Sequence, residues 1–64
     1  MRWTDVYDIA YELEQAHPDA DILGLSFPTL WQWVQDLPGF EDNPESSNEK
    51  ILEAIQMAWL KERD

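Results

Sequence analysis

The stretch SSNEKILEAIQMAWLKE, residues 46–62, decides the fold of this chain. Its apolar residues recur at intervals of three and four, which is the spacing of one face of an α-helix. The residues predicted to form this buried face are Ile51, Leu52, Ile55, Ala58 and Trp59. Ser46 and Glu49 match a capping box, in which both side chains bond backbone N–H groups at a helix start. We therefore expect a helix that is capped by Ser46 and ends at about residue 62.

Two shorter stretches upstream show the same periodicity. Residues 5–17 carry an apolar face of Val6, Ile9, Ala10 and Leu13. We expect Thr4 to cap that helix and Pro18 to end it, because the residue before a proline is pushed out of the helical region. Residues 28–37 carry a face of Leu30, Trp33, Val34 and Leu37, with Pro28 at the first helical position.

The connections between these stretches complete the predicted fold. Leu25 and Phe27 alternate with a serine, which permits one very short extended segment. Residues 38–47 form an acidic loop that Phe40 is expected to anchor to the core. The sequence thus predicts a mainly all-α fold over residues 1–64: a single, small three-helix, winged-helix-like domain with at most a minimal extended segment.

The charge of the chain limits its partners. The 64 residues include 14 Asp or Glu and 4 Lys or Arg, which gives a formal net charge of −10. Nucleic acid and anionic membranes are poor partners because this charge repels phosphate. Cations and basic protein surfaces remain. No apolar run resembles a signal peptide or a membrane span, so we expect a cytoplasmic protein.

The side chains that most enzymes need are scarce. The chain has no Cys, and His17 is its only His. Ser46 and Ser47 are better explained as helix caps than as nucleophiles. A domain this small leaves little room for a cleft that would shift the pKa of a carboxyl group. We expect a protein that is not an enzyme.

Carboxylates on and after the first helix are candidate metal ligands. These candidates are Asp5, Asp8, Glu12, Asp19 and Asp21. The first three share one helical stripe, and carboxylate oxygens suit hard divalent cations and Fe²⁺. The segment from Asp19 resembles the start of an EF-hand loop but lacks its later acidic ligands, so binding should be weak. The alternative is a solvated helix face that complements the helix dipole.

A second acidic group surrounds the end of the second predicted helix. Its members are Asp36, Glu41, Asp42 and Glu45. They form either a docking surface for a basic partner or a solvated loop that keeps a small protein soluble. Three apolar residues fall outside the helical faces, and they cover the edge of the core or form a contact patch. These residues are Trp31, Met57 and Leu60.

Several motifs together resemble the IscX family, small acidic proteins encoded with the bacterial iron–sulfur cluster assembly machinery. The early marks are WTD at residues 3–5, Phe27 before a helix that bears Trp33, and DL at residues 36–37. The strongest are FEDNP at 40–44, SNEKILEAI at 47–55 and WL at 59–60. The resemblance extends over essentially the whole chain.

This resemblance implies a modified winged-helix fold that does not act on DNA. It implies weak Fe²⁺ binding by surface carboxylates, and docking on the cysteine desulfurase near the basic surface that bacterial frataxin uses, in competition with frataxin. The positions that match the family's acids are Asp5, Asp8, Asp19, Asp21, Asp36, Glu41 and Asp42. Departures include Tyr11 at an acidic position, with Glu12 one residue further on, and Asn43 in place of a loop acid.

Together these observations predict a monomeric, iron-binding adaptor that regulates iron–sulfur cluster assembly by docking on the cysteine desulfurase. Charge alone supports only a cationic partner, and the identity of that partner rests on the resemblance. Two alternatives remain open: an acidic module that mimics DNA and blocks a basic protein, and a weak cation buffer with no protein partner.

Overall fold

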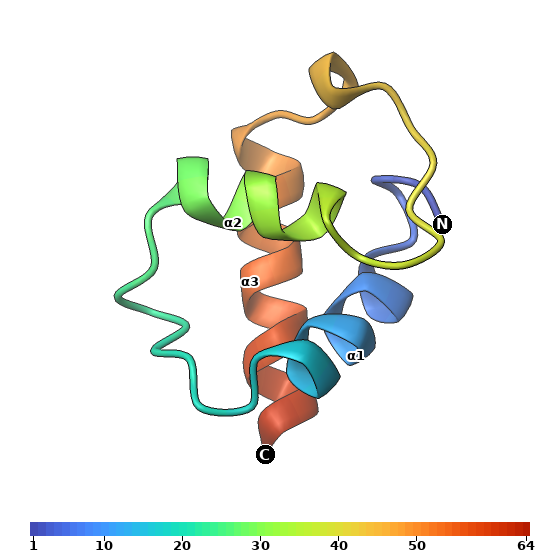
Figure 1. The fold of residues 1–64 in the computed structure, drawn as a ribbon. Helices are drawn as coiled ribbons and strands as arrows, with labels where there is room; N and C mark the ends of the chain where they lie inside the picture. The colour runs from blue at the N-terminus through green and yellow to red at the C-terminus, as the bar shows by residue number, and fades with distance from the viewer.

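A computed structural model describes all residues from 1 to 64 as three α-helices and one short 3-10 helix, with no β-strand (Figure 1). The helices are α1 (Val6–Ala16), α2 (Phe27–Gln35), η1 (Pro44–Ser46) and α3 (Glu49–Arg63). The mainly all-α prediction is confirmed. The very short extended segment that the sequence permits at Leu25 and Phe27 does not form, because Phe27 already belongs to the first turn of α2. None of the helices is long and apolar enough to cross a membrane.

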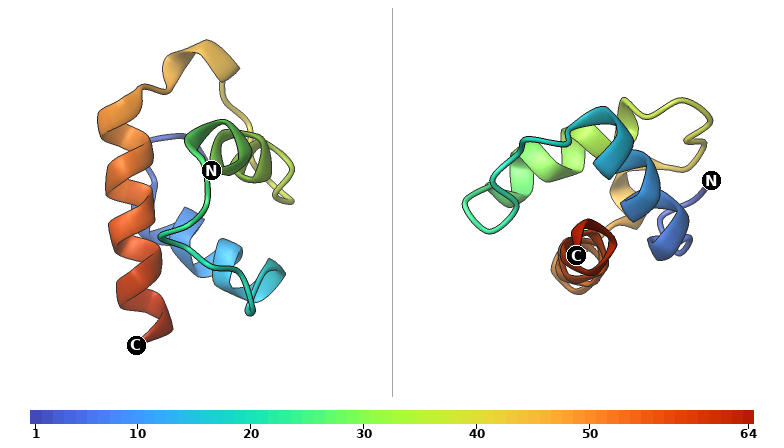
Figure 2. Two further views of the ribbon diagram at one scale, coloured as in Figure 1. Left: turned by 90° about the vertical axis from the view of Figure 1, so that its left-hand side faces the viewer. Right: turned by 90° about the horizontal axis from the view of Figure 1, so that it is seen from below.

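The longest helix, α3, is the axis on which the other two pack. Figure 2 shows α1 and α2 on the same side of α3, with α2 towards its start and α1 towards its end. The most extensive contacts are those between α1 and α3. The opposite side of α3 carries no other element of the chain.

The core consists of apolar side chains only, and no polar side chain is buried. The buried residues are Trp3, Ile9, Ala10, Leu13, Ile22, Leu30, Val34, Leu37, Leu52, Ile55, Ala58 and Trp59. Most of the predicted helix faces are therefore confirmed. Val6, Trp33 and Ile51, which belong to those faces, are only half-buried and pack against the edge of the core.

The helix caps differ from the predicted ones by one or two residues. Asn48 caps α3, and its Oδ1 accepts a hydrogen bond of 2.9 Å from the Ile51 N–H. The predicted cap, Ser46, instead lies in η1. Asn and Ser cap helices equally well, so the sequence did not distinguish them. The cap of α2 is Ser26, which places Pro28 at the second helical position.

The start of α1 also differs from the expectation. Asp5, and not Thr4, occupies the cap position, and it makes no side-chain bond to the helix. Its carboxylate instead accepts a hydrogen bond of 2.8 Å from the Arg2 N–H. This bond closes a turn that precedes the helix and orients the N-terminal residues.

The N-terminal residues fasten the loop that follows α2. The Met1 ammonium donates to the Gly39 carbonyl at 2.6 Å, and the Met1 carbonyl accepts from the Glu41 N–H at 2.9 Å. The Trp3 indole N–H donates to the Asn43 carbonyl at 2.8 Å. The Trp3 and Phe40 rings meet edge-on at 4.8 Å, which confirms Phe40 as the anchor of this loop. We call this set of contacts the N-terminal clamp.

A polar network joins the end of α3 to the end of α1. Arg63 donates to the Glu14 carboxylate at 3.0 Å, to the His17 carbonyl at 3.0 Å and to the Ala20 carbonyl. Glu14 also accepts a bond of 2.9 Å from the Trp59 indole N–H. The carbonyls at a helix C-terminus lack partners within the helix. Arg63 therefore fixes the end of α1 and the segment after it.

Replacing Arg63 with Ala should lower the free energy of unfolding by about 1–2 kcal/mol, because several partly exposed charge-assisted bonds are lost together. Urea unfolding followed by tryptophan fluorescence measures this change. Lys61→Ala removes the same charge from the same turn without breaking an ion pair, and it should change stability by less than about 0.5 kcal/mol. Equal losses in the two variants would contradict a structural role for Arg63.

Candidate functional site

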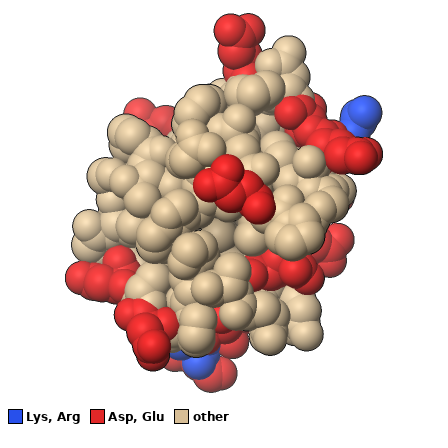
Figure 3. Space-filling view, viewed as in Figure 1, with Lys and Arg blue, Asp and Glu red and all other residues tan.

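The acidic side chains are spread over the surface and are hardly neutralised within the chain. The one ion pair joins Arg63 to Glu14, with 3.0 Å between Nη2 and Oε1. Figure 3 shows one face of the molecule, where Asp and Glu lie mainly around the margin and Lys and Arg appear only at its edges. The charge of −10 thus faces solvent almost unpaired.

Two of the three first-helix acids, Asp8 and Glu12, share one side of α1. Asp8 and Glu12 are one turn apart and line a shallow hollow of about 340 Å³ together with Tyr11, Gly39 and neighbouring residues. Asp5 is at the cap of the same helix, and its carboxylate is bonded to the Arg2 N–H. Asp8 and Glu12 therefore form the most open carboxylate pair on this stripe.

Asp19 and Asp21 lie beyond the other end of α1. The 11 residues of that helix span about 16 Å, which separates these acids from Asp5. Asp21 Oδ1 accepts a bond of 3.3 Å from the Gly24 N–H, and a Cβ on Gly24 would lie 2.3 Å from Asp21 Oδ2. Asp21 thus shapes its own turn. No three His, Cys, Asp or Glu side chains come close enough to hold a metal ion.

The second acidic group contains two kinds of carboxylate. Glu41 and Glu45 are exposed, and their carboxylates make no hydrogen bond within the chain. Asp36 is held by the Gln32 amide at 3.0 Å. Asp42 accepts from the Trp3 N–H at 3.1 Å and from the Asn43 N–H at 2.8 Å. We call these four residues the loop patch.

The bonds to Asp42 have an electrostatic consequence. Hydrogen bonds from the Trp3 and Asn43 N–H groups lower the pKa of the Asp42 carboxyl below its ordinary value of 3.8, because they stabilise the ionised form. Arg2 and the N-terminal ammonium act in the same direction. Asp42 is therefore a structural part of the N-terminal clamp as well as a member of the loop patch.

The three apolar residues outside the predicted helix faces, Trp31, Met57 and Leu60, differ in how far they are buried. The Trp31 indole N–H donates to the Pro44 carbonyl at 3.0 Å, and its ring packs against the core. Leu60 is half-buried at the core edge. Met57 remains 55% exposed.

His17 lies at the end of α1 as expected, but its ring stacks on Trp33, with 3.8 Å between the ring centres, a contact that the sequence did not reveal.

Comparison with known proteins places the chain in a family. The family described as "Iron-sulphur cluster assembly" matches residues 1–64. The chain belongs to the IscX family of iron–sulfur cluster assembly proteins. An uncharacterized protein of Pseudomonas aeruginosa is 48% identical over 64 residues, which cover 100% of this chain and 97% of that relative. The resemblance found in the sequence is confirmed, and with it a role in cluster assembly.

Membership of the IscX family indicates the process in which the two acidic surfaces act, but it gives no role to any individual acidic residue. The structure keeps the candidate ligands on α1 apart from those at Asp19 and Asp21, and it separates free from engaged carboxylates in the loop patch. Sequence reasoning treated Glu41 and Asp42 alike. The missed distinction depends on Trp3, whose N–H lies 39 residues earlier in the chain.

Asp42→Asn should destabilise the fold at about pH 6 and less so in acid. The folded state has the lower pKa, so ionised Asp42 contributes stability above pH 3.8 that is lost as the pH falls through the folded-state pKa. The gap between the urea midpoints of wild type and variant should therefore close in acid. Glu41→Gln, whose carboxylate has no bond to lose, is the control. A gap that is independent of pH would contradict this assignment.

Proposed function

We propose that this IscX-family protein is a non-enzymatic adaptor that regulates iron–sulfur cluster assembly by docking its loop patch on a basic surface of the cysteine desulfurase. The observation that carries the proposal is the rigid display of unpaired carboxylates. Glu41 and Glu45 lie on a loop that the N-terminal clamp holds on one side and Trp31 on the other. An ordered surface loses little entropy when a partner binds.

The distribution of charge favours a docking role. Every buried side chain is apolar, so the charged groups act from the surface. Opposite charges across an interface accelerate encounter and select partners more than they raise affinity. An excess of ten negative charges on 64 residues would therefore direct the protein to a strongly basic surface.

Iron is proposed as a weakly held cargo, carried by open carboxylates on α1. Asp8 and Glu12 are the best-placed pair because they face a hollow and make no bond within the chain. With only two carboxylates as protein ligands, water would occupy most of the coordination positions of Fe²⁺, which limits affinity. Iron bound there would reduce the negative charge of α1 and so weaken or redirect docking. A protein that only buffers cations would lose charge in the same way when it binds iron. Binding to the desulfurase therefore distinguishes the proposed adaptor from a cation buffer.

The docking proposal is tested by calorimetry with the cysteine desulfurase. Reversing both free loop acids, Glu41→Lys with Glu45→Lys, should raise Kd at least tenfold, because two attractive contacts become repulsive. The control, Glu53→Lys with Glu62→Lys, makes the same charge change on α3 and should have a clearly smaller effect. Asp42 is left intact, since its loss would disturb the clamp.

Salt provides the second arm of this test. The Kd of wild type should rise steeply between about 50 and 500 mM salt, because exposed charges are screened. A Kd that stays flat over this range, or equal losses in the two double variants, would contradict docking through the loop patch. Absence of any binding, together with competition against DNA for a basic protein, would favour the DNA-mimic alternative.

Iron binding is tested by NMR titration with Fe²⁺, which broadens signals of nearby nuclei. Wild type should show broadening around Asp8 and Glu12 first, and Asp8→Asn with Glu12→Gln should abolish it. The matched control, Asp19→Asn with Asp21→Asn, should leave it unchanged. Uniform broadening over the whole surface would show that iron follows charge in general and has no site on α1.

A further inference from the structure

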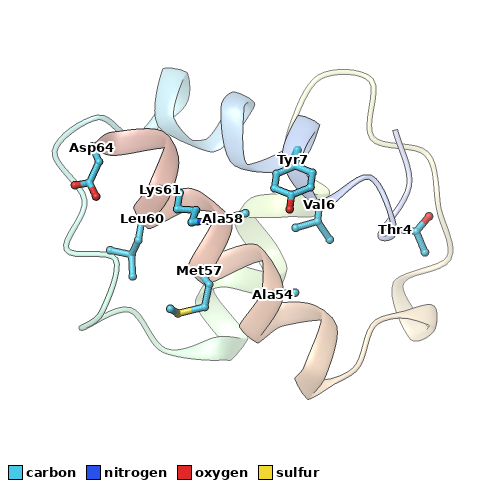
Figure 4. A pocket seen from close by; sticks show the side chains of 9 residues that line it. All are labelled: Thr4, Val6, Tyr7, Ala54, Met57, Ala58, Leu60, Lys61 and Asp64. Atoms are coloured by element: carbon cyan, nitrogen blue, oxygen red, sulfur yellow. The ribbon is translucent and has the colours of Figure 1, made fainter.

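The largest hollow on the molecule is apolar, in contrast to the acidic surface around it. It lies between α1 and α3 and has a volume of about 610 Å³ (Figure 4). Val6 and Tyr7 form its α1 side, Met57 and Leu60 its outer side on α3, and Ala54 and Ala58 lie between them. We call this hollow the α1/α3 groove.

Large apolar side chains in the groove are exposed to solvent and do not belong to the buried core. Tyr7 is 79% exposed and Met57 is 55% exposed. Small domains bury apolar surface wherever they can, and clustered exposed apolar groups mark contact sites. Methionine is also common at binding surfaces, because its flexible thioether adapts to different partners.

We propose that the α1/α3 groove binds the apolar face of a basic amphipathic helix from a partner protein. The proposal requires neither iron nor the desulfurase, and the groove shares no residue with the loop patch. The groove would be a second docking surface, in which apolar contacts hold the partner.

The shape of the groove favours a helix. Its α3 residues follow helical spacing from Ala54 to Asp64, so the groove runs along α3 for about three turns, or about 15 Å. Ala54 and Ala58 are small enough to let a partner helix approach closely between the larger side chains. A helix presents anchors at matching intervals of three and four residues. A peptide that binds by adding a β-strand would need a strand edge to pair with, and the chain has no strand.

The charge of the chain selects the occupant. Asp64 lines one end of the groove, and Glu53 precedes Met57 by one turn on α3. Lys61 is the single cation that lines the groove. A second copy would bring another ten negative charges, and an acidic helix would also be repelled, whereas a helix with Lys or Arg beside its apolar face is attracted.

The test uses a synthetic helix as the probe. A fluorescent peptide of about 18 residues, built from Leu on one face and Lys on the other, is titrated with the full chain, and anisotropy gives Kd. Two comparison peptides keep the length: one replaces Leu with Ser and keeps the charge, and the other replaces Lys with Glu and keeps the apolar face. Only the Leu/Lys peptide should bind tightly.

Matched variants locate the site. Met57→Gln and Tyr7→Ser should each raise Kd about tenfold, the loss expected when a buried apolar contact is removed. Leu23, which is 70% exposed, and Tyr11, which is 50% exposed, lie outside the groove. Leu23→Gln and Tyr11→Ser should therefore leave Kd within about twofold. All four side chains are exposed, and circular dichroism verifies that each variant keeps its helices.

Three results would overturn the proposal. Equal binding of the Ser-containing peptide would show that the acidic surface alone attracts the probe. Equal losses in the groove variants and the control variants would place the site elsewhere. Sedimentation of wild type as a dimer that strengthens with salt and is lost in Met57→Gln would identify a second copy as the occupant, because salt screens repulsion between like-charged chains.

Discussion

The fold depends on the burial of Trp59 where the three helices meet. Its side chain is completely buried, and its indole N–H is bonded to Glu14 of α1. Its ring lies 6.3 Å from that of Trp33 of α2, and the Arg63 guanidinium lies 5.6 Å from its ring centre. A chain of this length buries only about 60% of its unfolded surface, so one large buried side chain makes a large contribution to the free energy of unfolding.

The acidic surface is compatible with this small core because the two are kept apart. Like charges one turn apart, such as Asp8 with Glu12, cost a few tenths of a kcal/mol each, and only one ion pair offsets them. The loops are held by backbone bonds and aromatic contacts of the N-terminal clamp. The carboxylates can therefore stay unpaired on an ordered surface, where they are free to meet a basic partner.

Local pattern predicted the elements well and their ends less well. The apolar faces of the helices around Leu13, Val34 and Ile55 were predicted because helical spacing is a short-range property. The cap of α3 was assigned to Ser46, whereas Asn48 holds it, since both residue types bond free N–H groups and only the path of the preceding loop decides between them. The role of Arg63 was missed because its acceptors, the Glu14 carboxylate and the His17 and Ala20 carbonyls, lie more than 40 residues earlier in the chain.

The sequence by itself determined the negative charge, the three helical faces, the absence of cysteine chemistry and the membership of the IscX family. Tertiary structure alone decided which acids are free. It tied Asp42 to Trp3, left Glu41 and Glu45 open, separated Asp8 from Asp19, and formed the α1/α3 groove. The physical reason is range: helix periodicity acts over a few residues, whereas hydrogen bonds and hollows depend on residues that only the folded chain brings together.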